Sequence, residues 1–140
     1  MYGGSLENRM RFLLNIIREI RNQCGPDFPV IVRLTVEEFF DTQGMPNTGI
    51  QLDEGVEIAR RLERAGVDAI DVSCGNYESG NTTIETMRYP QGWRRYLVKA
   101  VKDAVSIPVI GVGVIREPDF AEELLEDGTQ DFIGLARPLL

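Results

Sequence analysis

The 140-residue chain has no histidine, only two cysteines and a single tryptophan. Without histidine it lacks the side chain that most often serves as an acid or base near neutral pH. Cys24 and Cys74 are too few and too far apart in the sequence for a metal or iron–sulfur motif, so we expect no metal site. We also expect both thiols to be reduced, which is typical of a cytoplasmic protein.

Long apolar runs and an excess of positive charge are missing as well. No apolar run approaches the roughly 18 residues that a membrane span needs. Met1-Tyr-Gly-Gly lacks the basic and apolar regions of a signal peptide. The net charge of −7 argues against nucleic acid or an anionic membrane as a partner, because phosphate groups attract cationic surfaces.

The chain does contain a regular alternation of helical and strand-like segments. Apolar residues at helical spacing predict helices between Ser5 and Gly25, over 53–65 and 93–105, and from Pro118 to a stop at Gly128. Short apolar runs predict strands; their ranges are 28–35, 67–73, 107–112 and 132–135. This alternation predicts an α/β fold whose strands are parallel and lie side by side in sequence order.

The polar segments point to one end of this sheet. Two long ones, 36–51 and 74–91, follow strands, whereas the returns from helix to strand are short. In α/β folds the carboxyl end of the strands carries the ligand site. There, the turn after 107–112 offers backbone N–H groups and the turn after 132–135 offers Arg137, a pair that suits a phosphate. The glycines of this first turn fit tight strand packing equally well.

Four strands are too few to close a barrel. The chain begins with a helix that no strand precedes and stops without a helix after the last strand, so we expect residues 1–140 to form a single partial domain. Half a barrel leaves two strand edges and one apolar face uncovered. We place that face at Ile31, Ile70, Val109 and Ile133, or at their strand neighbours. Open edges pair readily with other chains, so we expect a homo-oligomer.

Five segments resemble, in order and spacing, the old yellow enzyme family of flavin-dependent ene-reductases. They are Tyr2–Phe12, Pro29–Leu34, Gly66–Ser73, Pro108–Gly113 and Gly134–Leu139. The most similar branch is that of the 2,4-dienoyl-CoA reductases and 2-enoate reductases. The resemblance implies the C-terminal half of a TIM (β/α)8 barrel that binds FMN and takes electrons from NADH or NADPH. It also implies reduction of the activated C=C bond of a small enone or enoyl substrate.

The resemblance assigns roles to individual residues. The implied FMN-binding residues are Arg33, Gly113, Val114, Ile115, Ala136 and Arg137. Arg33 would lie at the pyrimidine edge of the flavin, where a cation stabilises the reduced ring. The turn at Gly113 would hold the phosphate through backbone N–H groups, and Arg137 would pair with it. Many family members have glycine in place of Val114.

Other family features are not expected in this chain. The catalytic tyrosine region would precede Tyr2, and the cysteines of a 4Fe-4S cluster would follow Leu140, so we expect the isolated chain to be inactive. The branch has a histidine after its sixth strand, but this chain has none there. Tyr77 is the nearest residue, and it is a weak catalytic candidate that fits an ordinary loop position better.

Several alternatives stay open at this point. The chain could belong to another phosphate-binding barrel enzyme, such as a dihydroorotate-dehydrogenase-like flavoprotein or a phosphosugar enzyme. It could also be a half-barrel that self-associates without cofactor or activity. Arg33 could be an edge residue or half of a buried ion pair, and Arg137 could be an ordinary surface arginine.

Overall fold

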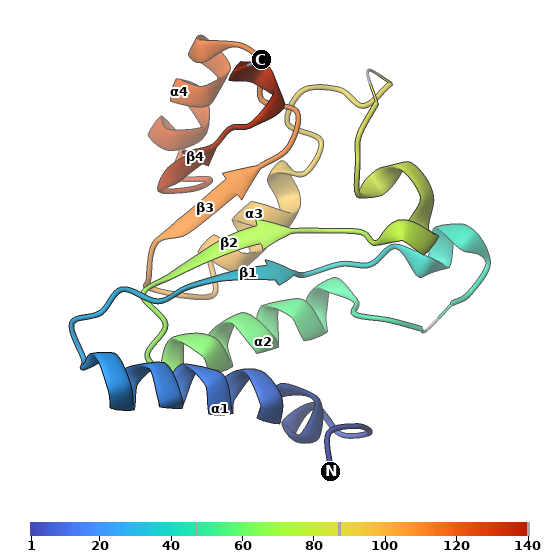
Figure 1. The fold of residues 1–140 in the computed structure, drawn as a ribbon. Coiled ribbons are helices and arrows are strands. Elements are labelled where there is room, and N and C mark those ends of the chain that lie inside the picture. The colour runs from blue at the N-terminus through green and yellow to red at the C-terminus, as the bar shows by residue number, and fades with distance from the viewer. Residues whose placement is uncertain (47, 87, 140) are drawn as a thin grey trace.

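The four strands form one parallel sheet in the order β1-β2-β3-β4, as the sequence predicted (Figure 1). The structure is a computed structural model that describes residues 1–46, 48–86 and 88–139. Its helices and strands are α1 (Leu6–Cys24), β1 (Ile31–Thr35), α2 (Leu52–Arg64), β2 (Ala69–Ser73), α3 (Arg95–Lys102), β3 (Val109–Val112), α4 (Pro118–Glu126) and β4 (Phe132–Gly134). None of the helices in these ranges is long and apolar enough to cross a membrane.

The helix ends follow from local chemistry. At the start of α1, the Ser5 hydroxyl accepts a hydrogen bond from the N–H of Asn8 at 3.4 Å, and Gly25 ends the helix with φ 86°. α3 covers only the middle of the predicted range 93–105. Its last turn closes through a tighter bond from the N–H of Ala104 to the carbonyl of Val101, and the chain then leaves the helix.

β1 and β3 begin later than the apolar runs predicted, at Ile31 and Val109 instead of residues 28 and 107. A proline without an N–H group stands one or two residues before each strand. The carboxylates of Asp68 and Asp131 then accept hydrogen bonds from the N–H groups of Val30 (2.6 Å) and Val109 (2.7 Å). Where β1 and β3 begin, side-chain oxygens therefore accept these N–H groups in place of a backbone carbonyl from a neighbouring strand.

The hydrophobic core lies between the sheet and helices α1, α2 and α3, which pack on one side of it (Figure 1). Alternate strand residues point into this core, as the pleat of a strand requires. The buried residues from the strands and helices include Val32, Leu34, Ile70, Val72, Val109, Met10, Ile17, Ile58, Leu62, Leu97 and Val101. This layer fixes the strands, and the strands in turn fix the loops at their carboxyl ends.

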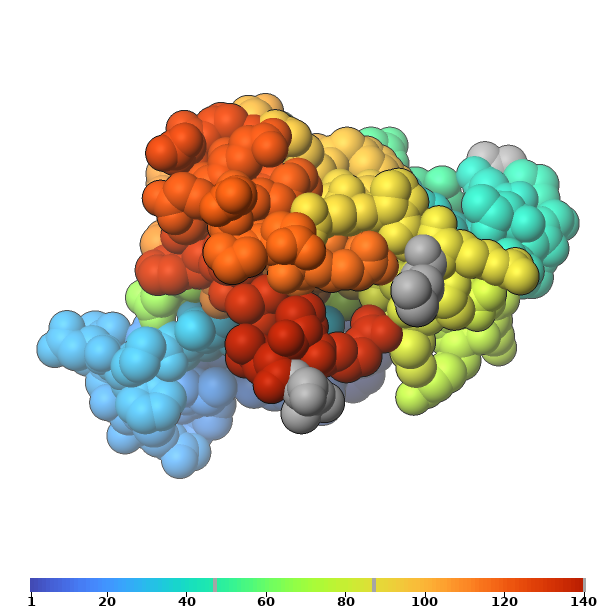
Figure 2. Space-filling view, turned by 90° about the horizontal axis from the view of Figure 1, so that it is seen from above, coloured from blue at the N-terminus to red at the C-terminus, as the bar shows by residue number. Residues whose placement is uncertain are grey.

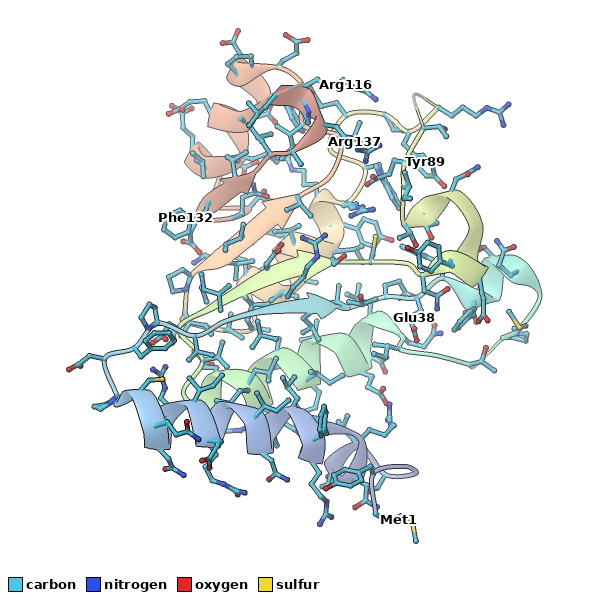
Figure 3. The ribbon with its side chains drawn as sticks, viewed as in Figure 1. Met1, Glu38, Tyr89, Arg116, Phe132 and Arg137 are labelled. Carbon is cyan, nitrogen blue, oxygen red and sulfur yellow. The ribbon has the colours of Figure 1, made fainter. Side chains whose placement is uncertain are left out.

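Side chains on the opposite face of the sheet are much less covered. Ile31, Arg33 and Phe132 are exposed there, and Phe132 points away from the ribbon in Figure 3. Within the described part of the chain, β1 and β4 each have a strand neighbour on one side only. One face and two edges of the sheet are therefore open.

The sequence predicted four residues for this open face, or their strand neighbours, and only one of the four lies on it. Ile31 does lie on it, but Ile70 and Val109 are fully buried on the helix side, and the register places Ile133 on that side too. The strand neighbours of these three residues line the open face instead. Because successive side chains alternate, a shift of one residue exchanges the two faces. Both faces of these strands carry apolar residues, so the sequence pattern does not decide between them.

The open face generates a prediction about assembly. We expect residues 1–140 alone to associate, at micromolar concentration, into a species of at least twice the 15.7 kDa chain mass. Exposed apolar side chains and unpaired strand edges both favour pairing with a second copy. Sedimentation equilibrium measures this directly. Replacing Ile31 and Phe132 with lysine should shift the distribution toward the monomer. A single 15.7 kDa species for the unmodified chain would contradict the prediction.

Candidate functional site

A cleft of about 330 Å3 lies at the carboxyl ends of the strands and is lined by all six residues to which the family resemblance assigns cofactor binding. Those residues are Arg33, Gly113, Val114, Ile115, Ala136 and Arg137. Seen from above, the C-terminal segment (red) borders the loop before α3 (yellow) (Figure 2). The cleft therefore joins residues from Arg33 on β1 to Arg137 after β4, about a hundred positions apart in the sequence.

The turn after β3 has an unusual backbone. Gly113 has φ 109° and Val114 has φ 51°, so both lie in the left-handed region that favours glycine. For a β-branched residue such as Val114 this conformation costs roughly 1–2 kcal/mol. In the described part of the chain, the N–H groups of Val114 and Ile115 donate to no protein acceptor. The turn therefore leaves two donors available to a ligand.

Gly111 and Gly113 must lack a side chain for different reasons. A Cβ at Gly111 would lie 1.7 Å from the Oε1 atom of Gln130, whose side chain fills the space beside the strand and donates to the carbonyls of Gly111 and Phe132. A Cβ at Gly113 would lie 2.7 Å from Cδ of Arg94 and 2.8 Å from Oε1 of Glu85. Strand packing therefore explains Gly111, whereas Gly113 is kept free of a side chain by the neighbouring Arg94 and Glu85.

A buried ion pair that the sequence did not predict forms one wall of the cleft. Glu85, with 2% of its side chain exposed, has its Oε1 atom 2.5 Å from Nε of Arg94, which is also buried. The contact is an ion pair without a hydrogen bond, because the Nε–H of Arg94 has no hydrogen-bond partner among the described residues. The Nη2 atom of Arg94 donates to the carbonyl of Thr82 at 2.7 Å. Glu85 lies inside the polar segment 74–91, where nothing in the local sequence distinguishes it from a solvated residue.

Arg137 reaches this wall from the other side of the cleft. Its Nη1 donates to the backbone carbonyl of Glu85 at 3.0 Å, and its Nη2 donates to Oε2 of Glu85 at 3.1 Å. Its side chain is nevertheless 60% exposed. In Figure 3 it lies on the side of the C-terminal segment that faces the loop carrying Tyr89. Arg137 is therefore held at one end while much of its guanidinium faces the open cleft.

Arg33 lies on the edge strand β1 and forms an ion pair with Asp71 on β2, at 2.8 Å between Nη1 and Oδ2. The pair lies on the open face and lines the cleft. The second carboxylate oxygen of Asp71 and the hydroxyl of Thr83 are buried and have no partner among the described residues. Buried polar groups without partners are costly, so the cleft has hydrogen-bonding capacity that a ligand or water can use.

The weak catalytic candidate Tyr77 lies outside the cleft. It begins the short 3-10 helix Tyr77–Thr82 and is 90% exposed. Cys74, next to β2, is buried, and burial raises the pKa of its thiol to about 12. Since the thiolate is the reactive form, Cys74 is not a nucleophile at neutral pH.

All 140 residues match the family described as NADH:flavin oxidoreductase / NADH oxidase. An NADH oxidase from Thermoanaerobacter brockii is 48% identical over 139 residues, which are 99% of this chain and 20% of that protein. A cinnamate reductase from Clostridium sporogenes is 35% identical over 147 residues, 99% of this chain and 22% of that protein. The chain thus spans about a fifth of the length of these relatives.

Solved structures agree with this match. Histamine dehydrogenase from Rhizobium sp. 4-9 superposes with a TM-score of 0.81 and 30% identity, over 98% of this chain and 19% of that chain. Morphinone reductase gives a TM-score of 0.59 at 24% identity, over 99% of this chain and 32% of that chain, which supports the fold alone. The four-stranded parallel sheet therefore has the fold of part of a TIM-type barrel. The chain belongs to the NADH:flavin oxidoreductase family, the old yellow enzymes, as its five motifs predicted.

The crowding at Gly113 generates a prediction about stability. We expect Gly113→Ala to lower the free energy of unfolding by about 1–3 kcal/mol, because the new Cβ meets Arg94 and Glu85 and φ is positive. Urea unfolding, followed by the fluorescence of Trp93, the only tryptophan of the chain, measures the change. Gly3→Ala is the control, since a Cβ at Gly3 has nothing within 4 Å. Equal midpoints for the two variants would contradict the prediction.

Proposed function

We propose that this chain supplies the phosphate-binding and pyrimidine-binding side of an FMN site in an NADH- or NADPH-dependent reductase. The proposed reaction is reduction of the activated C=C bond of a small enone or enoyl substrate. The observation that carries the proposal is the single cleft in which Arg33, the Gly113 turn and Arg137 meet. Family membership, and a cinnamate reductase among the relatives, support the same reaction class.

The residues present fit the FMN phosphate. A phosphate monoester is a small anion that needs several donors at close range. The N–H groups of Val114 and Ile115 and the exposed part of the Arg137 guanidinium can supply them. Glycine is required at position 113, because a Cβ there would lie 2.7 Å from Cδ of Arg94 and 2.8 Å from Oε1 of Glu85.

Arg33 fits the other end of the cofactor. When bound, FMN supplies hydride transfer between the nicotinamide donor and the alkene. Arg33 would stabilise the negative charge that a reduced flavin carries on its pyrimidine ring. Its pairing with Asp71 at 2.8 Å orients the guanidinium on the open face of the sheet. The proton donor that the family places ahead of the Tyr2 motif is not one of the residues of this chain.

Residues 1–140 are then a partial domain, the C-terminal half of the FMN barrel, with the rest of the flavin site contributed by other strands. Membership in the flavin family removes the phosphosugar enzyme from the alternatives. The visible spectrum of the purified protein distinguishes the proposed FMN-binding protein from a half-barrel that binds no cofactor. A flavin absorption band supports the proposal, and a colourless protein that takes up no added FMN opposes it.

The phosphate site can be tested through Arg137. We expect Arg137→Ala, in the intact polypeptide that carries this chain, to weaken FMN binding about tenfold to a hundredfold, or roughly 1.5–3 kcal/mol, because a charge-assisted contact is lost. Quenching of flavin fluorescence on titration gives the dissociation constant. Arg18→Ala on α1 makes the same charge change on the helix side and should leave it unchanged. FMN affinity equal to that of the parent protein would count against the site.

Residues 1–140 alone should not turn over substrate. They hold at most half of the proposed flavin site and lack the expected proton donor. We therefore expect no oxidation of NADH or NADPH above the rate without protein when the chain is mixed with FMN and an enone. Absorbance at the nicotinamide band follows the reaction. Turnover that depends on both the enone and the chain would overturn this expectation.

A further inference from the structure

The cleft contains a carboxylate that the proposed FMN contacts leave unused. Glu85 is buried beside the turn at Gly113, where a phosphate-binding cleft would be expected to exclude negative charge. Its two oxygens have separate partners. Oε1 contacts Nε of Arg94 and accepts a hydrogen bond from the indole N–H of Trp93 at 3.2 Å, whereas Oε2 accepts from Arg137.

We propose that Glu85 is a positioning residue that holds Arg137 in place for the phosphate of FMN. This proposal rests on the proposed function. In the part of the chain that the structure describes, every side-chain hydrogen bond and ion pair of Arg137 goes to Glu85. An arginine offers five N–H donors, and these contacts use two of them. Three donors remain for an anion in the cleft.

The geometry indicates that Glu85 positions Arg137 and does not compete with the phosphate for it. Arg94 and Trp93 fix one oxygen of the carboxylate, so the other oxygen is presented to Arg137 from a rigid support. Arg137 is more than half exposed, and without this support its long side chain would lose rotational freedom when a phosphate binds. Two guanidinium groups face the one carboxylate, so the cluster keeps a net positive charge.

The same contacts connect the loops of three strands. Glu85 and Arg94 belong to the segment between β2 and α3, Arg137 follows β4, and both members of the buried pair contact the place where a Cβ of Gly113 would lie after β3. The long polar segment 74–91 thereby gains a function. It brings the Glu85 carboxylate from the segment after β2 into contact with Arg137, which follows β4, past the intervening strand β3.

A charge-conserving substitution tests the proposal in the intact polypeptide. Glu85→Asp keeps the negative charge but withdraws it from Arg137 by one methylene group. We expect the dissociation constant of FMN to rise about tenfold, while that of riboflavin, which has no phosphate, stays the same. Glu78→Asp, at an exposed position in the same segment, is the matched control and should change neither constant. Should Glu85→Asp fail to fold, Glu85→Gln takes its place with the same expectations.

A double variant tests whether Glu85 acts by positioning Arg137 or has a general structural role. In Arg137→Ala, the Glu85 substitution should have no further effect on FMN, because the residue through which it acts is gone. Equal weakening of FMN and riboflavin, or an additive effect in the Arg137→Ala background, would overturn the proposal. A parent protein that binds FMN no better than riboflavin would instead refute the phosphate site itself, so the two failures are distinguishable.

Discussion

The site depends on one buried carboxylate. Removing Glu85 from water is costly unless cations compensate it, and Arg94 and Arg137 do so from two different elements. Because both arginines must reach the same carboxylate, the loops that carry them have little freedom to move apart. Gly113 must also remain without a side chain, since a Cβ there would contact the buried pair. The shape of the cleft follows from satisfying this charge.

The sequence predicted the order of the elements, their parallel arrangement and the six residues that now line one cleft. The order and direction of the elements have local signatures, such as apolar period and glycines at turns, whereas the six residues came from the resemblance to a family. Glu85 and Arg94 have none, because their burial results from three loops that meet only in the folded chain. The sequence also did not predict which strand residues face the helices and which lie on the open face. It depends on strand register, and Ile70 and Phe132 are equally apolar although only Ile70 is buried.

The cleft combines satisfied and unsatisfied groups in a way that suits a ligand site. The strained φ of Val114, the unpaired oxygen of Asp71 and the unpaired hydroxyl of Thr83 all lie along its lining. Each costs free energy in the fold, and none contributes to the hydrophobic core. The helix side of the sheet shows the opposite character, with dense packing of aliphatic residues such as Leu62 and Leu97. The hydrophobic core thus lies on the helix side of the sheet, whereas the unsatisfied polar groups lie along the cleft.

The contact between Gly111 and Gln130 has a consequence for how the sequence can vary. The amide of Gln130 occupies the volume that any side chain at position 111 would need, and it also bonds the carbonyls of β3 and β4. A larger residue at 111 therefore requires a smaller one at 130, and a smaller one at 130 loses those bonds. A side chain at position 111 therefore cannot be introduced without a change at position 130, although 19 residues separate the two in the sequence.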